Sequence, residues 1–359
     1  MTLLLYEPFD GYELNSSYFL TKYGNVGYQL TRNASGVTGR PSGSIFALRN
    51  ASLSGEGQFV FTGGTHPETI VYLALYIRAN SPDIVFGSSV NSATFYIRIS
   101  ATTITINNNV QEVFSIPNTS VPYNTWNFLQ IRSVISSGSF GSGSVELKND
   151  GKLIFSASNI NTNGSNRTPA LGMFYVNLPN FRENSVLIDD ILILETTGSS
   201  FNEPIGTGNF FMASYIPSSS GVYTDMTSSG ASTDANAINE RPPNNDTSYL
   251  IATSSGPFPL RETFTLRPAN TGSTFTTIPI SASIEAILKR SVARASIIGV
   301  SGFDHLLRVN GADYTGSVPI SASTTYTDFI NGWERNPNTG NKFLPSEFSS
   351  LETGFIRNS

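Results

Sequence analysis

Strand-like runs of apolar residues set the pattern of this chain. Residues 69–78 read TIVYLALYIR, and such a run of mostly β-branched and aromatic residues is typical of a strand buried on both faces. Residues 94–99 (TFYIRI), 102–106 (TTITI) and 126–134 (WNFLQIRSV) alternate apolar and polar positions with a period of two. Residues 186–194 (VLIDDILIL) read as a further core strand. The pattern predicts an all-β protein.

The segments between these runs carry turn signals. Asn149, Asp150 and Gly151 separate two short apolar runs, and Asp-Gly between strands is a strong hairpin signal. The Gly/Ser tract at residues 136–144 predicts a mobile hairpin loop. Residues 345–351 (PSEFSSL) predict one helical turn that begins at the proline or the serine.

A break in composition divides the chain into two predicted domains. A chain of 359 residues exceeds what one hydrophobic core usually organises. Residues 196–209 carry Gly, Ser and Pro but few side chains that could pack, which is typical of a linker. We therefore predict one domain over residues 1–195, a linker over 196–209 and a second β domain over 210–359.

The second predicted domain contains one ambiguous and one unusual segment. Residues 284–298 (IEAILKRSVARASII) could form a helix, but Val and Ile recur and the flanking segments are β-rich, so we predict a strand. Residues 217–248 are rich in Ser, Asp, Asn and Pro and read as a long polar loop. Loops of this length usually have a function, so we predict that it contacts another copy or another protein.

Composition narrows the class of protein. Charged residues make up 13% and hydrophobic residues 39%, which is too apolar for a disordered chain and too polar for a membrane protein. The lack of cysteine excludes disulfides and thiolate metal sites. No apolar run approaches the ~20 residues of a spanning helix, and the first residues lack a signal-peptide pattern. We therefore expect a protein made and folded in a cytosol, with no membrane partner.

The charge pattern argues against binding to nucleic acid. The net charge is −5 and the predicted pI is about 5.2, whereas phosphate binding needs concentrated positive charge. The densest basic group is Lys289, Arg290 and Arg294, which we expect on a solvated strand face.

Several short motifs occur in a characteristic order in the first predicted domain. They are residues 39–44 (GRPSGS), the strand at 69–78, Trp126, the hairpin at 145–152 (VELKNDGK) and the strand at 186–191 (VLIDDI). In this order they resemble the concanavalin-like jelly roll of laminin-G-type domains. The resemblance implies a β-sandwich, followed here by a second β-sandwich-like domain.

A second set of motifs extends the resemblance to nearly the whole chain. The pieces are residues 189–198 (DDILILETTG), 239–249 (NERPPNNDTSY), 334–340 (ERNPNTG), and the pairs 347–348 and 354–355. They resemble a group of tailed-bacteriophage virion proteins. Glu195 replaces an Asp of that pattern, and Phe343 and Leu344 stand where the pattern has Trp-Thr. The resemblance implies a particle component without saying which part of the particle.

The carboxylates at residues 189–195 match neither a calcium-binding loop nor the active site of a glycosidase. Asp189 and Asp190 could join a calcium site, since hard oxygen ligands suit Ca²⁺. No D-x-D-x-D-G loop accompanies them, so we expect one to cap a loop amide and the other to be solvated. Glycosidases of concanavalin-like folds commonly carry paired carboxylates as E-x-D-x-E, and the spacing of Asp189, Asp190 and Glu195 lacks that alternation. We therefore expect no polysaccharide hydrolysis and no enzyme.

Histidines and aromatic residues are the remaining candidates. His66 and His305 are too few for a His-rich metal site, and a Ser-His triad is defined by geometry that a sequence does not show. We expect both to be ordinary surface or loop residues. Trp126 and Trp333 lie in strand-like patterns and are expected in the core. Five tyrosines near the start of the chain could stack on sugar rings or pack in the sandwich: Tyr6, Tyr12, Tyr18, Tyr23 and Tyr28.

Two function hypotheses from different classes follow. The first is a bacteriophage virion structural component, a capsid decoration or cement protein or a tail- or fibre-associated protein, which contacts neighbouring virion subunits and its own copies. It would be assembled in the host cytoplasm and reside in the virion. The second is a carbohydrate-binding adhesin on the virion surface that contacts host glycans. Fold alone does not decide between them. We assign no catalytic, cofactor-binding or metal-ligating residue and no cofactor.

Overall fold

The computed structural model divides the chain into two compact units, Met1–Met212 and Ala213–Ser359. In the first unit, side chains are described only within residues 96–162 and at Ile191 and Leu192. The described residues are 2–7, 28–32, 46–50, 57–60, 70–79, 84–88, 95–108, 111–134, 143–162, 174–178, 186–195, 213–239, 247–253, 258–268, 278, 280–295, 302–316 and 324–358. The predicted linker at 196–209 and the Gly/Ser tract up to residue 142 lie outside them, so the domain boundaries stay a prediction.

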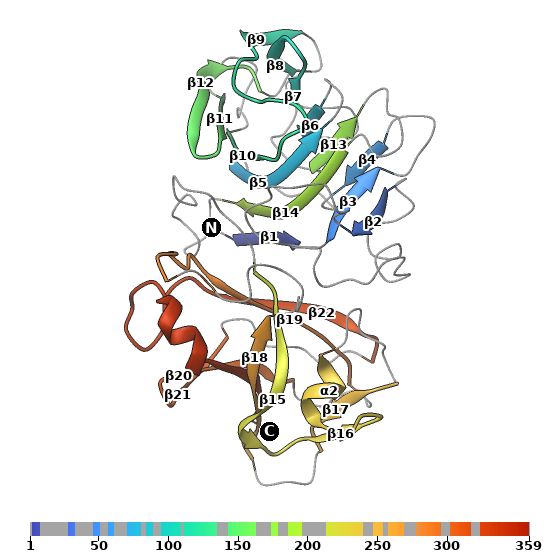
Figure 1. Cartoon of the computed structure of the whole chain (residues 1–359), viewed down its shortest axis with the longest axis vertical. Helices are drawn as coiled ribbons and strands as arrows, with labels where there is room; N and C mark the ends of the chain where they lie inside the picture. The colour runs from blue at the N-terminus through green and yellow to red at the C-terminus, as the bar shows by residue number, and fades with distance from the viewer. Residues whose placement is uncertain are drawn as a thin grey trace. The chain divides into compact units, whose positions relative to one another are not determined.

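The described strands of the first unit form two antiparallel sheets (Figure 1). The eight-stranded sheet has the order β12-β11-β10-β5-β14-β3-β2, and β1 also pairs with β14. Its strands are β1 (Thr2–Glu7), β2 (Tyr28–Arg32), β3 (Phe46–Asn50), β5 (Ile70–Ala79), β10 (Asn127–Val134), β11 (Gly143–Asn149), β12 (Lys152–Ile160) and β14 (Val186–Glu195). The six-stranded sheet has the order β4-β13-β6-β7-β8-β9. Its strands are β4 (Gly57–Val60), β6 (Ile84–Ser88), β7 (Phe95–Ile99), β8 (Thr103–Asn108), β9 (Glu112–Pro117) and β13 (Phe174–Leu178).

Side chains of both sheets form an apolar core. Ile97 and Ile99 of β7 and Ile104 and Ile106 of β8 are buried, as period-two alternation requires. The eight-stranded sheet contributes buried residues such as Phe128, Leu147 and Phe155. The rings of Phe114 in β9 and Phe155 in β12 lie 5.4 Å apart, so the edge strands of the two sheets meet. The predicted β-sandwich fold class is confirmed.

The Asp-Gly hairpin forms as predicted. Asp150 (φ 48°) and Gly151 (φ 75°) both adopt the left-handed conformation that a two-residue type I′ turn between β11 and β12 requires. The Asn149 side chain fastens the hairpin by donating to Asn127 Oδ1 (2.9 Å) and to the Ser120 carbonyl (2.8 Å).

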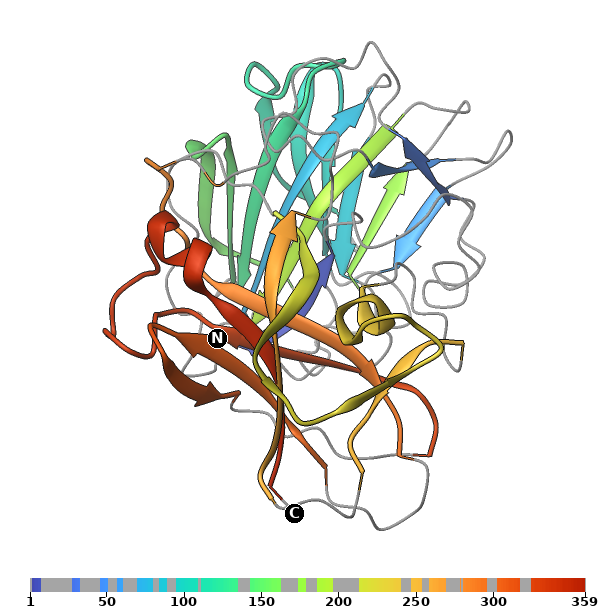
Figure 2. The same ribbon diagram turned by 60° about the horizontal axis from the view of Figure 1, so that its bottom comes forward.

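The second unit is also built almost entirely of strands. Its five-stranded sheet has the order β15-β18-β23-β20-β21, and β16–β17 and β19–β22 pair as separate two-stranded sheets. Figure 2 shows the short helix α2 beside the β16–β17 pair. The elements are β15 (Tyr215–Thr224), β16 (Thr227–Ser229), α2 (Asp234–Ile238), β17 (Tyr249–Ile251), β18 (Leu260–Pro268), β19 (Ile287–Ala293), β20 (Asp304–Val309), β21 (Ala312–Thr315), β22 (Thr327–Trp333), η1 (Pro345–Ser350) and β23 (Glu352–Arg357).

Two local predictions in this unit are confirmed and one is wrong. The strand predicted within 284–298 is β19, and the predicted helical turn is the 3₁₀ helix η1 with proline in its first turn. The polar stretch 217–248 is not one long loop: its described part contains most of β15, then β16 and α2. Hydroxyl groups of Ser218 and Ser219 lie 2.9 and 2.7 Å from Thr265 Oγ1, so serines here line an edge strand.

Apolar residues from several elements form the core of the second unit. The buried cluster comprises Leu307, Val309, Trp333, Phe343 and Leu351. Trp333 therefore lies in the core as predicted. In the part of the chain that the structure describes, no helix is long and apolar enough to cross a membrane.

Candidate functional site

One face of the six-stranded sheet carries polar and aromatic side chains. Ile97 and Ile99 point into the core, so Tyr96 and Arg98 on the same strand point to the opposite side. Pairing places Thr105 of β8 beside Arg98, and Ser115 of β9 beside Thr105. We call Tyr96, Arg98, Thr105, Asn107 and Ser115 the outer face.

The outer face offers hydrogen-bond donors and acceptors together with an aromatic ring. Arg98 and Ser115 are exposed, while Thr105 is only 8% exposed. The Asn107 side chain donates to Thr105 Oγ1 (2.9 Å), which fixes the orientation of its amide. Guanidinium, amide and hydroxyl groups around a tyrosine are the chemistry that hydrogen-bonds to sugar hydroxyls and packs on a sugar ring.

The same face continues across the rest of the sheet. The residue paired with Arg98 on β6 is Val85, which pairs in turn with Asn177 of β13. The residue paired with Tyr96 is Gly87, which pairs with Tyr175. The backbone pairing therefore continues in register from β7 through β6 to β13.

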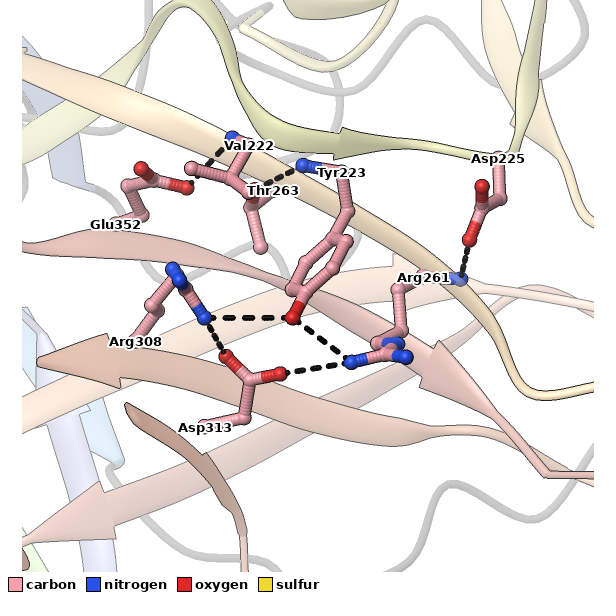
Figure 3. A network of polar contacts seen from close by, with 8 residues as sticks. All are labelled: Val222, Tyr223, Asp225, Arg261, Thr263, Arg308, Asp313 and Glu352. Atoms are coloured by element: carbon pink, nitrogen blue, oxygen red, sulfur yellow. Dashed lines mark hydrogen bonds and ion pairs between the residues drawn. The ribbon is translucent and has the colours of Figure 1, made fainter. Parts of the chain in front are cut away.

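A second polar cluster lies on the five-stranded sheet and is shown in Figure 3. Between the pairs Ser220–Phe264 and Thr224–Glu262, β15 has extra residues that form a bulge at 221–223. At Gly221 a side chain would collide with the Glu352 carboxylate and the Thr263 hydroxyl, so the bulge needs glycine there.

Hydrogen bonds fasten this bulge to the sheet. The backbone N–H of Val222 donates to Glu352 Oε2 (2.9 Å), and that of Tyr223 donates to Thr263 Oγ1 (3.1 Å). Both acceptors are side-chain oxygens, one from β23 and one from β18, so the bulge is held across two strands (Figure 3).

Two arginines and an aspartate surround the Tyr223 ring. The Tyr223 hydroxyl accepts from Arg261 (2.8 Å) and Arg308 (3.4 Å), and Asp313 accepts from both guanidinium groups. The Arg261 guanidinium carbon lies 4.2 Å from the ring centroid, a cation–π distance. Burial alone would raise the pKa of Asp313, but hydrogen bonds from Arg308, Tyr223 and Arg261 lower it overall. One carboxylate is shared by two guanidinium groups, and the four side chains come from β15, β18, β20 and β21, so the cluster acts as a brace within the unit.

A third cluster surrounds His305, which is buried and not a surface histidine as expected. Its Nε2 lies 2.6 Å from Ser291 Oγ, and its Nδ1 lies 3.0 Å from Asn331 Nδ2. The order Ser-His-Asn matches that of a nucleophile, base and orienting group. Burial and the nearby Lys289 lower the pKa of His305 to about 2, however, so its imidazole is a weak base.

Lys289 corrects a further expectation, because it is half-buried against the Phe355 ring and does not lie on a solvated face. Its Nζ donates to the Gly354 carbonyl and lies 3.8 Å from the centroid of the Phe355 ring. Burial lowers the pKa of Lys289 well below its ordinary value. The cause is strand alternation, which turns Lys289 and Ser291 of β19 toward the sheet that carries His305.

The remaining sequence candidates do not converge on one site. Asp189 and Asp190 lie on β14, and Tyr6 and Tyr28 lie on β1 and β2, all in the eight-stranded sheet. His66 and three of the early tyrosines, Tyr12, Tyr18 and Tyr23, lie outside the described residues. Among the residues with described side chains, no group of three or more His, Asp or Glu is arranged to hold a metal ion.

Comparison with known proteins finds similarity in structure but none in sequence. No family model and no curated protein sequence matches this chain. Among solved structures, a PL-14 alginate lyase from Aplysia kurodai is similar over 54% of this chain and 100% of its own, with 11% identity and a TM-score of 0.35. A carbohydrate esterase from the Shiga toxin-encoding bacteriophage phi24B is similar over 54% of this chain and 97% of its own, with 13% identity and a TM-score of 0.33. The galectin LEC-6 of Caenorhabditis elegans covers 38% of this chain and 89% of its own, with 11% identity and a TM-score of 0.26.

These neighbours correct the expectation that the chain is not an enzyme. That expectation rested on the missing paired carboxylates of glycosidases. Lyases and an esterase are among the proteins with similar sandwiches, and their reactions are not glycoside hydrolysis. The missing pair therefore gives no ground for excluding catalysis.

Proposed function

We propose that the first unit binds carbohydrate through the outer face of its six-stranded sheet. The observation that carries the proposal is the arrangement of Tyr96, Arg98, Thr105, Asn107 and Ser115 on one face, opposite a wholly apolar set of isoleucines. Such a face pairs an aromatic surface with several hydrogen-bonding groups, which is what recognition of a polyhydroxylated ligand needs.

The strand framework supports the proposal because it holds these groups in fixed relative positions. Thr105 is nearly buried and Asn107 is tied to it, so both lose little conformational freedom on binding. Arg98 supplies charged donors for sugar hydroxyls or for acidic sugars.

A glycan array of bacterial surface polysaccharides, followed by titration of each hit, tests the proposal. Arg98→Ala is expected to weaken binding about 10-fold or more, since a hydrogen bond to a charged group contributes about 1.5–3 kcal/mol. Tyr96→Ala should also weaken it, because it removes the ring that packs on the sugar. Lys152→Ala is the matched control, because it removes an exposed cation from β12 in the other sheet. Absence of any array hit, or equal affinity of the two outer-face variants and the control, would overturn the proposal.

A second candidate function is that of a bacteriophage virion component that contacts neighbouring subunits. It rests on the motif order described from the sequence. One of those motifs, residues 334–340, forms a turn in which Asn336 is fully buried and donates to Glu347 Oε1 (2.8 Å). The motif therefore has a structural role, because its buried asparagine holds the turn in place. Such a role is expected in a scaffold protein.

Particles purified from an infected or induced host and probed with an antibody against this chain test the virion proposal. Labelling at a constant position on the particle is the expected result. A chain that is made during infection but is absent from purified particles contradicts it.

A further inference from the structure

The Glu262 carboxyl is an unusual group in the second unit. It lies on β18, its residue is 0% exposed, and it belongs to none of the clusters described above. Its Oε2 accepts the backbone N–H of Met226 (3.1 Å). Its Oε1 is buried and has no hydrogen-bond partner among the described residues.

The turn that Glu262 holds leads into the β16–α2–β17 segment. Asp225, next to Met226, accepts the backbone N–H of Arg261 (2.9 Å) and donates its own N–H to the Arg261 carbonyl (2.9 Å). These bonds and the one from Met226 to Glu262 attach the start of the segment to β18. Asp234 lies in the first turn of α2, within the same segment.

The charged groups that face Glu262 from this segment are acidic. Asp225 and Asp234 both raise the pKa of the Glu262 carboxyl by repulsion, after the larger effect of burial, while the bond from Met226 opposes the rise. The resulting pKa is about 7. Glu262 therefore changes its charge near neutral pH.

The basic side chains packed on this side of the sheet contact other groups. Next to Glu262 across the sheet lies Phe355, and His305 follows it in the same row. Lys289 lies over the Phe355 ring. Arg357 donates to the Ala252 carbonyl (3.0 Å).

We propose that Glu262 is a proton-controlled clasp that fastens the β16–α2–β17 segment to the five-stranded sheet. The neutral carboxyl is buried at little cost and keeps the turn at Met226 in place. The ionised carboxylate is buried beside Asp225 and Asp234, and opening of the segment relieves both its desolvation and this repulsion.

The direction of the effect follows from linkage. The closed segment holds the Glu262 proton up to a higher pH than the open segment, in which the carboxyl has its ordinary pKa of 4.5. Closure is therefore favoured at low pH and weakens as the pH rises through the range between those values. With a closed-state pKa of about 7, the population of the open form rises about 30-fold between roughly pH 5.5 and 8.5.

Hydrogen exchange of the full chain, followed by mass spectrometry and corrected for the intrinsic pH dependence of exchange, measures this opening. Peptides within residues 225–239 are expected to lose about 30-fold of their protection between roughly pH 5.5 and 8.5. Glu262→Gln should remove this dependence. Glu352→Gln is the matched control, because Glu352 also accepts one backbone N–H in the same sheet, and it should leave the dependence intact.

Two outcomes would overturn the clasp. Equal protection of the wild-type segment at both pH values does so without any variant. Retention of the full pH dependence in Glu262→Gln assigns the effect to another group.

Discussion

Replacing Asp313 by asparagine tests whether the cluster around Tyr223 braces the second unit. The substitution keeps the size of the side chain but removes its charge. The carboxylate accepts from both Arg261 and Arg308, whereas an amide presents only one oxygen. Its NH₂ group must then face one of the two guanidinium groups, where donor meets donor.

The expected loss is about 2 kcal/mol. A hydrogen bond to a charged group contributes about 1.5–3 kcal/mol when buried, and an exposed ion pair contributes about 0.2–1 kcal/mol. The side chains of Asp313 and Arg261 are 22% and 31% exposed, so their two-arginine cluster lies between these limits. For a unit of this size the loss corresponds to a fall of about 4–8 °C in Tm.

The two tryptophans allow the second unit to be observed separately. Trp126 lies in the first unit and Trp333 in the second, so Trp126→Phe leaves the fluorescence of Trp333 as the reporter. Urea unfolding in this background gives the free energy of unfolding. Asp304→Asn is the control, since Asp304 accepts one long bond from Asn358 (3.4 Å) and should lose little stability.

The pH dependence provides a second check on the same variant. The pKa of Asp313 is lowered in the folded protein, so its contribution is present above the ordinary aspartate range and is lost as the pH falls through the lowered value. The difference between wild type and Asp313→Asn should therefore shrink in acid. Equal stability of Asp313→Asn and Asp304→Asn near neutral pH would refute the brace.

Two further predictions concern single positions. Gly151→Ala places a side chain at φ 75° in the β11–β12 turn and should cost about 1–2 kcal/mol in the first unit; an unchanged urea midpoint for that unit, read from Trp126 fluorescence in a Trp333→Phe background, contradicts it. Lys289→Met should stabilise the second unit, because burial lowers the pKa of Lys289 in the folded state and its proton is taken up only on unfolding. The gain should grow as the pH falls below the ordinary lysine pKa of 10.5, and a smaller gain at the lower pH contradicts the prediction.

Much of the fold could be predicted because strand alternation is a local signal. The patterns at residues 69–78 and 186–194 correspond to β5 and β14, and the Asp-Gly pair marks the β11–β12 hairpin. The part of β15 from Pro217 onward reads as loop in the sequence, because it carries three serines instead of alternating apolar residues. Its stability depends on Thr265 of another strand, which a local pattern does not reveal.

The candidate sites depend on contacts between distant residues, so the sequence indicated them only in part. His305 shares its strand face with Leu307 and Val309, which is a readable signal that it points into the core. Its partners Ser291 and Asn331 come from β19 and β22, and no spacing rule joins them. The outer face likewise emerges only when pairing places Arg98, Thr105 and Ser115 in one row.

The bulge at residues 221–223 also shapes the exposed edge of the five-stranded sheet. β15 is the outermost described strand on its side of the five-stranded sheet, and a straight outermost strand offers free N–H and C=O groups to a strand of another molecule. Here Pro217 has no N–H to offer, and the N–H groups of Val222 and Tyr223 turn inward to side chains of the same sheet. The irregular path that supports the Tyr223 ring thereby removes a template for edge-to-edge aggregation.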